Sequence, residues 1–198
     1  MRRSALCVLA AVLSLSLVGV AQSNTPGYKL KVRTFSELAN EQRRIVLGYC
    51  RADFEGARLV PDNFVKVRPF VSYRTNPEFV SFEVVSRFDV PLPEQPGDSI
   101  SANYRVVGRW DNHAGWESQL TSESVQFTII EREGDLLINE VEPDKPRVSA
   151  RAALAYLRQQ LPSAASDIER GMMQKGIDAL SAMTASPVNP NSSNAAKP

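Results

Sequence analysis

The feature of this sequence that most restricts its fold is a change of hydrophobic period. From about residue 80 to residue 141, apolar and polar residues alternate in three or four runs separated by turn-forming residues. Such alternation is typical of an antiparallel sheet that is covered on one face. Helical spacing precedes and follows these runs, so the sequence predicts an α+β domain.

The helix before the sheet has clear start and stop signals. Thr34 and Glu37 match a capping box, and Gly56 is a suitable residue to end the helix. Apolar residues recur between them at helical spacing, which predicts a long amphipathic helix over residues 35–55. Pro61 and the residues after it predict one further helical turn.

Each alternating run predicts a strand with one apolar face. The third run continues through a tight turn at residues 133–135 into a fourth strand over residues 136–141. The residues expected on the apolar face are Val80, Phe82, Val84, Phe88 and Val90, then Ile100, Ala102, Tyr104, Val106 and Trp110, then Val125, Phe127 and Ile129. Pro143 and Pro146 are expected to end the sheet.

Two helices are expected after the sheet. The first covers residues 149–161, and a second capping box, Ser166 to Glu169, opens another that ends near residue 183. The second helix is expected to bury Ile168, Met172, Ile177, Leu180 and Met183. Residues 184–198 are rich in Pro, Asn, Ser and Ala, a composition typical of a disordered tail.

The first 23 residues have the order of a secretory signal peptide. Arg2 and Arg3 precede an apolar stretch over residues 5–20, and small residues follow at Gly19 and Ala21. The stretch is shorter than the ~20 residues of a membrane-spanning helix, so we expect cleavage and no stable membrane anchor. Residues 24–33 form a lead-in that could hold a strand, and the mature chain is expected to be secreted or periplasmic.

The charge balance excludes several function classes. The chain has 23 basic and 22 acidic residues in 198, which gives no excess of positive charge for binding nucleic acid. The single histidine and two cysteines form no metal-ligand pattern, so neither a metal nor another cofactor is expected. Nucleophile-elbow and phosphate-loop motifs are also absent from the sequence.

Three segments resemble parts of a known fold family. Residues 49–59 (YCRADFEGARL), 84–88 (VVSRF) and 104–110 (YRVVGRW) are similar to secreted bacterial domains of the nuclear transport factor two-like superfamily. The resemblance covers residues 34–161 and leaves residues 162–183 as an added helix. It implies a long N-terminal helix packed on a curved, cone-shaped antiparallel sheet of three to four strands. The superfamily contains isomerases, dehydratases, carriers and inactive interaction domains, so it names no single function.

The candidate ligand-binding residues are those expected to face the inside of the cone. Tyr49 and Asp53 share one stripe of the first helix, and Tyr104 and Trp110 share the apolar face of a strand. Asp53 is the candidate catalytic base, because burial would raise the pKa of its carboxyl. The alternative is a structural carboxylate at the helix edge that pairs with Arg51, Arg58 or a backbone donor. His113, in a turn, is a possible helper.

Three functions therefore stay open. The favoured one is non-catalytic binding of a small apolar ligand or a protein partner. The second is a proton-transfer enzyme that uses Asp53 inside an enclosed pocket. The third is an interaction domain with a filled cone that dimerises through polar residues of the sheet, namely Glu83, Arg87, Arg105 and Arg109.

Overall fold

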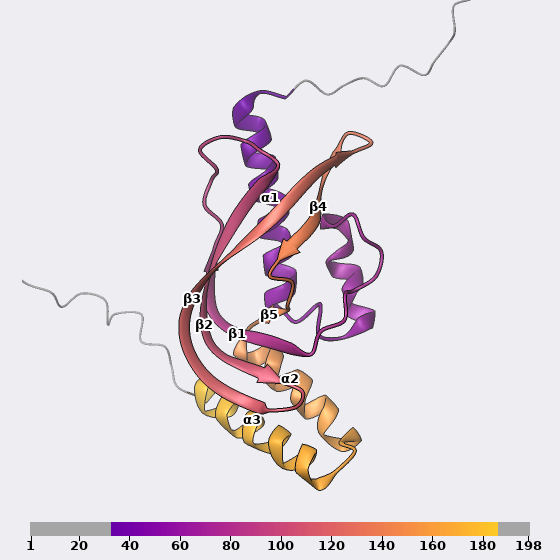
Figure 1. The fold of residues 1–198 in the computed structure, drawn as a ribbon, viewed down its shortest axis with the longest axis vertical. Helices are drawn as coiled ribbons and strands as arrows, with labels where there is room; N and C mark the ends of the chain where they lie inside the picture. The colour runs from indigo at the N-terminus through magenta and orange to yellow at the C-terminus, as the bar shows by residue number, and fades with distance from the viewer. Residues whose placement is uncertain (1–32, 186–198) are drawn as a thin grey trace, which may run out of the picture. The chain divides into compact units, whose positions relative to one another are not determined.

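The structure is a computed structural model that describes residues 33–185 (Figure 1). The expected signal peptide and lead-in lie outside the described residues, apart from Arg33. The expected tail also lies outside them, apart from Thr184 and Ala185, which belong to the last helix. The described part is an α+β domain with a strongly curved sheet and several helices, which confirms the predicted fold class.

Helix α1 covers Phe35–Phe54 and begins with the capping box. The Glu37 carboxylate accepts a hydrogen bond of 2.8 Å from the Thr34 backbone N–H, while the Thr34 hydroxyl accepts one from the Glu37 backbone N–H. Gly56 follows the helix with φ of +85°, a conformation that glycine adopts without strain. Two short 3₁₀ helices, Pro61–Lys66 and Arg68–Phe70, then lead toward the sheet.

The sheet has five strands in the order β4-β3-β2-β1-β5. The strands are β1 (Ser81–Asp89), β2 (Ser99–Asp111), β3 (Gly115–Arg132), β4 (Asp135–Glu142) and β5 (Arg147–Val148). The first four are antiparallel neighbours, and Glu133 and Gly134 make the tight turn between β3 and β4 with positive φ angles. The expectation that the sheet ends at the prolines is wrong, because the two residues of β5 pair with β1 in parallel.

Irregular pairing in β1 and β2 divides the interior into two cores. The β1–β2 register shifts on both sides of Val85, and the β2–β3 register shifts between Val106 and Gly108. An extra residue in one strand reverses which side chains face which side. Val85, Tyr104 and Val106 consequently pack in the core against α1, whereas Phe82, Val84 and Trp110 belong to a second core.

The second core lies under the two C-terminal helices, α2 (Ala150–Gln160) and α3 (Asp167–Ala185), which lie together at one end of the sheet (Figure 1). Trp110 was expected beside Tyr104 on one apolar face, and the shift in β2 is the reason that it is not. A short 3₁₀ helix, Leu161–Ser163, connects α2 to α3.

In α3 the expected buried stripe is only partly right. Ile177 and Leu180 are buried, but Ile168 is 78% exposed. Met173 is buried, whereas the expected Met172 is only half-buried. The Ser166 hydroxyl caps the Glu169 backbone N–H, so the helix starts where the sequence predicts. Ile168 is in its first turn, before the helix comes into contact with the second core.

The polar sheet face is also arranged differently from the prediction. Glu83 and Arg109 are cross-strand register partners, but Glu83 is buried and pairs with Lys145 and Arg147. Arg109 forms its ion pair with Asp111, at 3.3 Å. The expected single polar face of four residues is therefore wrong, because the register shifts place Glu83 on the α1 side of the sheet and leave Arg87 and Arg105 on the other.

Candidate functional site

Asp53 lies in the last turn of α1 and joins this helix to β5. Its Oδ2 accepts a hydrogen bond of 2.8 Å from the backbone N–H of Arg147, and the side chain is almost completely buried. Burial raises the pKa of Asp53 to about 6, although Arg58 and the Arg147 N–H both favour the ionised form. The Ser149 backbone N–H donates to the Phe54 carbonyl at 2.8 Å, which closes the same junction.

Arg58 is buried on the other side of this junction. One guanidinium nitrogen donates to the Tyr49 hydroxyl at 2.7 Å, and another forms an ion pair of 2.7 Å with Asp144. Asn76 accepts a hydrogen bond from Arg58 Nε at 3.2 Å and donates one to the Arg58 carbonyl at 2.7 Å. Arg58 therefore holds α1 and the loop around Asn76 in one arrangement.

A second ionic cluster surrounds Arg147. Its guanidinium lies 3.2 Å from Glu83 and 3.4 Å from Glu123, and Lys145 completes the group by pairing with Glu83. Burial raises the pKa of Glu83 in spite of these cations. Two buried or half-buried carboxylates thus share two basic side chains, an arrangement that fixes β5 against β1.

The structure brings three of the four predicted ligand-binding residues together. Tyr49, Asp53 and Tyr104 all lie in the core beside α1 or at its border, where the Tyr104 hydroxyl donates to Cys50 Sγ at 2.9 Å. The Arg147 guanidinium lies over the Tyr104 ring, 5.1 Å from its centre. Trp110 is in the second core, so the structure does not place it in this group.

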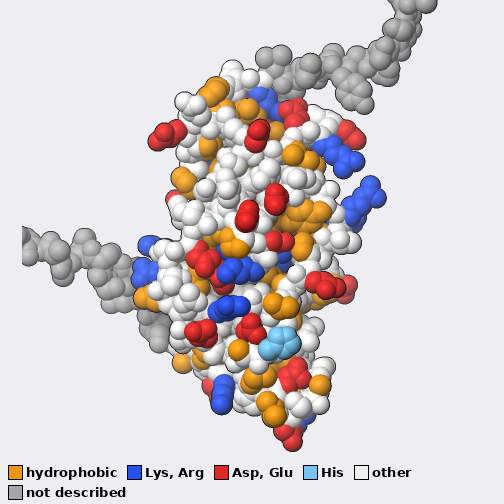
Figure 2. Space-filling model, in the orientation of Figure 1, with side chains coloured by type: hydrophobic (Ala, Val, Ile, Leu, Met, Phe, Trp, Pro, Cys, Tyr) orange, Lys and Arg blue, Asp and Glu red, His pale blue; other side chains and the backbone are white. Residues whose placement is uncertain are grey.

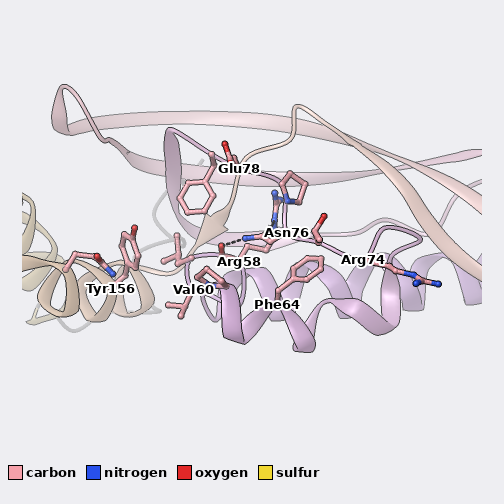
Figure 3. Close-up of a pocket in the computed structure, with 13 residues that line it drawn as sticks. Arg58, Val60, Phe64, Arg74, Asn76, Glu78 and Tyr156 are labelled. Atoms are coloured by element: carbon pink, nitrogen blue, oxygen red, sulfur yellow. Dashed lines mark hydrogen bonds between the residues drawn. The ribbon is translucent and has the colours of Figure 1, made fainter. Parts of the chain in front are cut away.

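An open cleft of about 680 Å³ lies next to Arg58 (Figure 3). One wall is the loop that contains Asn76 and Glu78, and the opposite wall contains Tyr156 of α2. Asp53 does not border this cleft. The full lining is Arg58, Leu59, Val60, Pro61, Phe64, Arg74, Thr75, Asn76, Pro77, Glu78, Phe79, Tyr156 and Gln160.

His113 forms no ion pair with either ionic cluster in the described residues. It is exposed in the turn between β2 and β3, where its backbone N–H donates to Asp111 at 2.9 Å. Together with Trp110 and Met172 it borders a second cleft of about 560 Å³. No hydrogen bond, ion pair or shared cleft in residues 33–185 links His113 to Asp53, so the structure gives the histidine no part in the group around Asp53.

Sequence reasoning did not predict Asn76, Asp144 and Arg147 at the site, and it named Arg58 only as a candidate partner of Asp53. The available signal was weak: Arg58 stands between Ala57 and Leu59 just after a helix stop, and Arg147 stands between Pro146 and Val148. An arginine enclosed by apolar residues in a short connection can be buried when acids lie nearby in space. Those acids come from distant parts of the chain, so the sequence does not show them.

The surface has no continuous basic area on the face seen in Figure 2, where acidic and basic side chains are interspersed. Within residues 33–185, no cluster of three or more His, Cys, Asp or Glu side chains is suited to hold a metal ion. None of the helices in that range is both long and apolar enough to cross a bilayer. Comparison of the chain with protein-family models, curated proteins and solved structures gives no match.

Proposed function

We propose that this chain is a non-catalytic binding domain whose open cleft beside Arg58 accommodates an extended segment of a protein partner. The observation that carries this proposal is that solvent reaches the cleft but does not reach the side chains predicted to bind a ligand. The cleft is open to solvent and its volume of about 680 Å³ is in the usual range for binding sites. Tyr49, Asp53 and Tyr104, by contrast, are at most 3% exposed.

The loop wall of the cleft has backbone groups that are not engaged in secondary structure. Residues 73–79 form no regular secondary structure and make no backbone-to-backbone hydrogen bond with other residues in the described range. Their free N–H and C=O groups can pair with a second extended chain, as in strand addition, except at Pro77. Half-buried Phe79 and Tyr156 offer apolar contact for its side chains.

The buried ionic network supports this wall. Asn76 is held by two hydrogen bonds to Arg58, which is itself fixed by Tyr49 and Asp144. A wall that is ordered before binding loses less conformational entropy when a peptide arrives. The network therefore acts as a support for the cleft, and its mixed polar lining suits a peptide better than a small apolar ligand.

The proposal is tested by selecting peptides on the chain from a random display library and locating their binding by NMR. We expect chemical-shift changes at Asn76, Glu78 and Tyr156. Gln160→Trp and Thr75→Trp, which fill the cleft, should weaken binding at least tenfold. Gln159→Trp is the matched control, because Gln159 is the exposed neighbour on α2 that does not line the cleft. Binding that survives both cleft variants, or shifts confined to other surfaces, would overturn the proposal.

Proton transfer by Asp53 remains a second candidate, favoured by one observation. The pKa of this buried carboxyl is raised to about 6, near the range of a useful general base, and its Oδ1 has no hydrogen-bond partner in the described structure. This function requires the core to open to a substrate. Native mass spectrometry of the purified chain distinguishes the two, since a retained small molecule would favour an internal pocket.

The proposal also includes the fold family of the chain and its location outside the cytoplasm. The curved sheet with α1 against one side is compatible with the cone of the nuclear transport factor two-like superfamily, which the three sequence segments resemble. The N-terminal sequence supports export to a secreted or periplasmic location. Determining the N-terminus of the chain recovered from its producing cells tests the export step directly.

A further inference from the structure

Two arginines face each other on the side of the sheet away from α1. Arg87 of β1 and Arg105 of β2 are register partners, and both are exposed. Cβ atoms of cross-strand partners are typically ~4.5–5.5 Å apart, and like charges at that spacing destabilise a sheet. The repulsion between the two guanidinium groups therefore lowers the stability of the sheet, and the pairing of the strands does not need arginine at these positions.

No ion pair within residues 33–185 offsets this repulsion. Neither guanidinium takes part in an ion pair there. Glu83 and Glu123, the acids of the neighbouring strand positions, are engaged with Lys145 and Arg147 on the other side of the sheet. Asp89 is on the same side as Arg87 but forms no ion pair with it.

The pair borders a hollow of about 250 Å³. The register places Asn103 opposite Asp89, and Ser122 of β3 opposite Arg105, so their side chains surround the same space. The hollow thus offers two guanidinium groups, one amide and one hydroxyl as donors, against one carboxylate.

We propose that this hollow binds a single oxyanion group, a carboxylate, phosphate or sulfate, between Arg87 and Arg105. Guanidinium groups donate paired, charge-assisted hydrogen bonds to such groups, and two of them on adjacent strands can hold one anion from both sides. The bound anion removes the repulsion between the two arginines. The site is on β1–β3, separate from the proposed peptide cleft, and does not depend on it.

The direct test follows the arginine side-chain Nε–Hε signals by NMR during titration with acetate, phosphate or sulfate, with chloride holding the ionic strength constant. We expect saturable shifts at Arg87 and Arg105. Arg87→Gln should weaken binding at Arg105 at least tenfold, and Arg105→Gln should do the same at Arg87. Arg132→Gln is the matched control, an exposed strand arginine outside the hollow, and should leave binding unchanged.

The three anions distinguish the source of the group. Tighter binding of acetate indicates a carboxylate, such as an acidic side chain or a carboxylic acid, whereas tighter binding of phosphate or sulfate indicates an ester or a free inorganic anion. Shifts that grow linearly without saturation, or that are equal at Arg132, would overturn the proposal.

Thermal unfolding gives an independent readout. At low ionic strength Arg87→Gln should raise the unfolding temperature by a few degrees, because it removes the repulsion, and saturating anion should abolish this advantage. A lower unfolding temperature for Arg87→Gln at low ionic strength would contradict the proposal, as it would show that the two charges are already compensated.

Discussion

The Asp53 carboxylate accepts a hydrogen bond of 2.8 Å from the backbone N–H of Arg147, a residue 94 positions later in the chain. This contact joins the end of α1 to β5, the strand that the sequence did not predict. It also explains why Asp53 is buried without an accessible cavity: the carboxyl satisfies a backbone donor at the junction between helix and sheet.

The burial of Asp53 leads to a prediction for pH dependence. Its pKa in the folded state is raised from 3.8 to about 6, so the folded chain binds the proton more tightly than the unfolded chain does. The contribution of this group to stability is therefore complete below pH 4 and is lost as the pH rises through 6, by roughly 3 kcal/mol. Asp53→Asn should remove this component, which urea unfolding between pH 4 and pH 7 would measure.

Asp111 provides a control, because its effect on the pH dependence of stability has the opposite sign to that of Asp53. Hydrogen bonds from the His113 and Ala114 N–H groups lower the pKa of Asp111, so its contribution is present at neutral pH and lost on acidification. Asp111→Asn should therefore reduce the loss of unfolding free energy that occurs on acidification. If Asp53→Asn left the difference between pH 4 and pH 7 unchanged, the assignment of a raised pKa to Asp53 would be wrong.

Glu83 and Arg109 should differ strongly in their effect on stability although they are cross-strand partners. Glu83→Ala leaves Arg147 in the interior with one fewer counter-charge, and we expect a loss of about 3–5 kcal/mol in the free energy of unfolding. Arg109→Ala removes a side chain that is 41% exposed, and we expect about 0–1 kcal/mol. Equal losses in denaturant unfolding would refute the separate environments of the two residues.

Two glycines of α3 should respond to alanine in opposite directions. A Cβ at Gly176 would lie 2.9 Å from the Trp110 ring and 3.0 Å from Leu157, so Gly176→Ala should destabilise by about 1–3 kcal/mol through overpacking. A Cβ at Gly171 meets nothing within 4 Å, so Gly171→Ala should stabilise the helix by about 0.5–1 kcal/mol. Thermal unfolding of the two variants checks the signs, and a gain for both would mean that α3 does not pack closely on Trp110.

Cys50 should be unreactive in the folded chain. It is fully buried, and burial raises the pKa of its thiol to about 12 in spite of the hydrogen bond from Tyr104. In a Cys7→Ser background, an aromatic disulfide reagent should label Cys50 only at the rate of unfolding, and urea should accelerate the reaction. Rapid stoichiometric labelling without denaturant would show that the core beside α1 is open, which would in turn support an internal pocket.

Local signals explain how much of the fold was predictable. The capping residues Thr34 and Ser166, the glycine after α1 and the turn at Gly134 act over a few positions, and the structure has each of them at the predicted place. Val125, Phe127 and Ile129 are buried as their alternation predicts, because β3 itself carries no extra residue there: the shift between Thr128 and Ile129 comes from an extra residue in β4. The alternation rule failed for Trp110 and Glu83. One extra residue in a strand reverses which face the following side chains occupy, and the residue types do not reveal where such an extra residue lies.

The sequence by itself determined the α+β class, the approximate helix boundaries, the hairpin between β3 and β4 and the shared helix stripe of Tyr49 and Asp53, because these follow from hydrophobic period and short-range hydrogen bonding. Only the tertiary structure decided that Arg58 and Arg147 are buried with them, that Trp110 belongs to a second core and that Arg87 faces Arg105. The physical reason is that burial of a charge depends on partners brought from distant parts of the chain, such as Asp144 for Arg58 and Glu83 for Arg147.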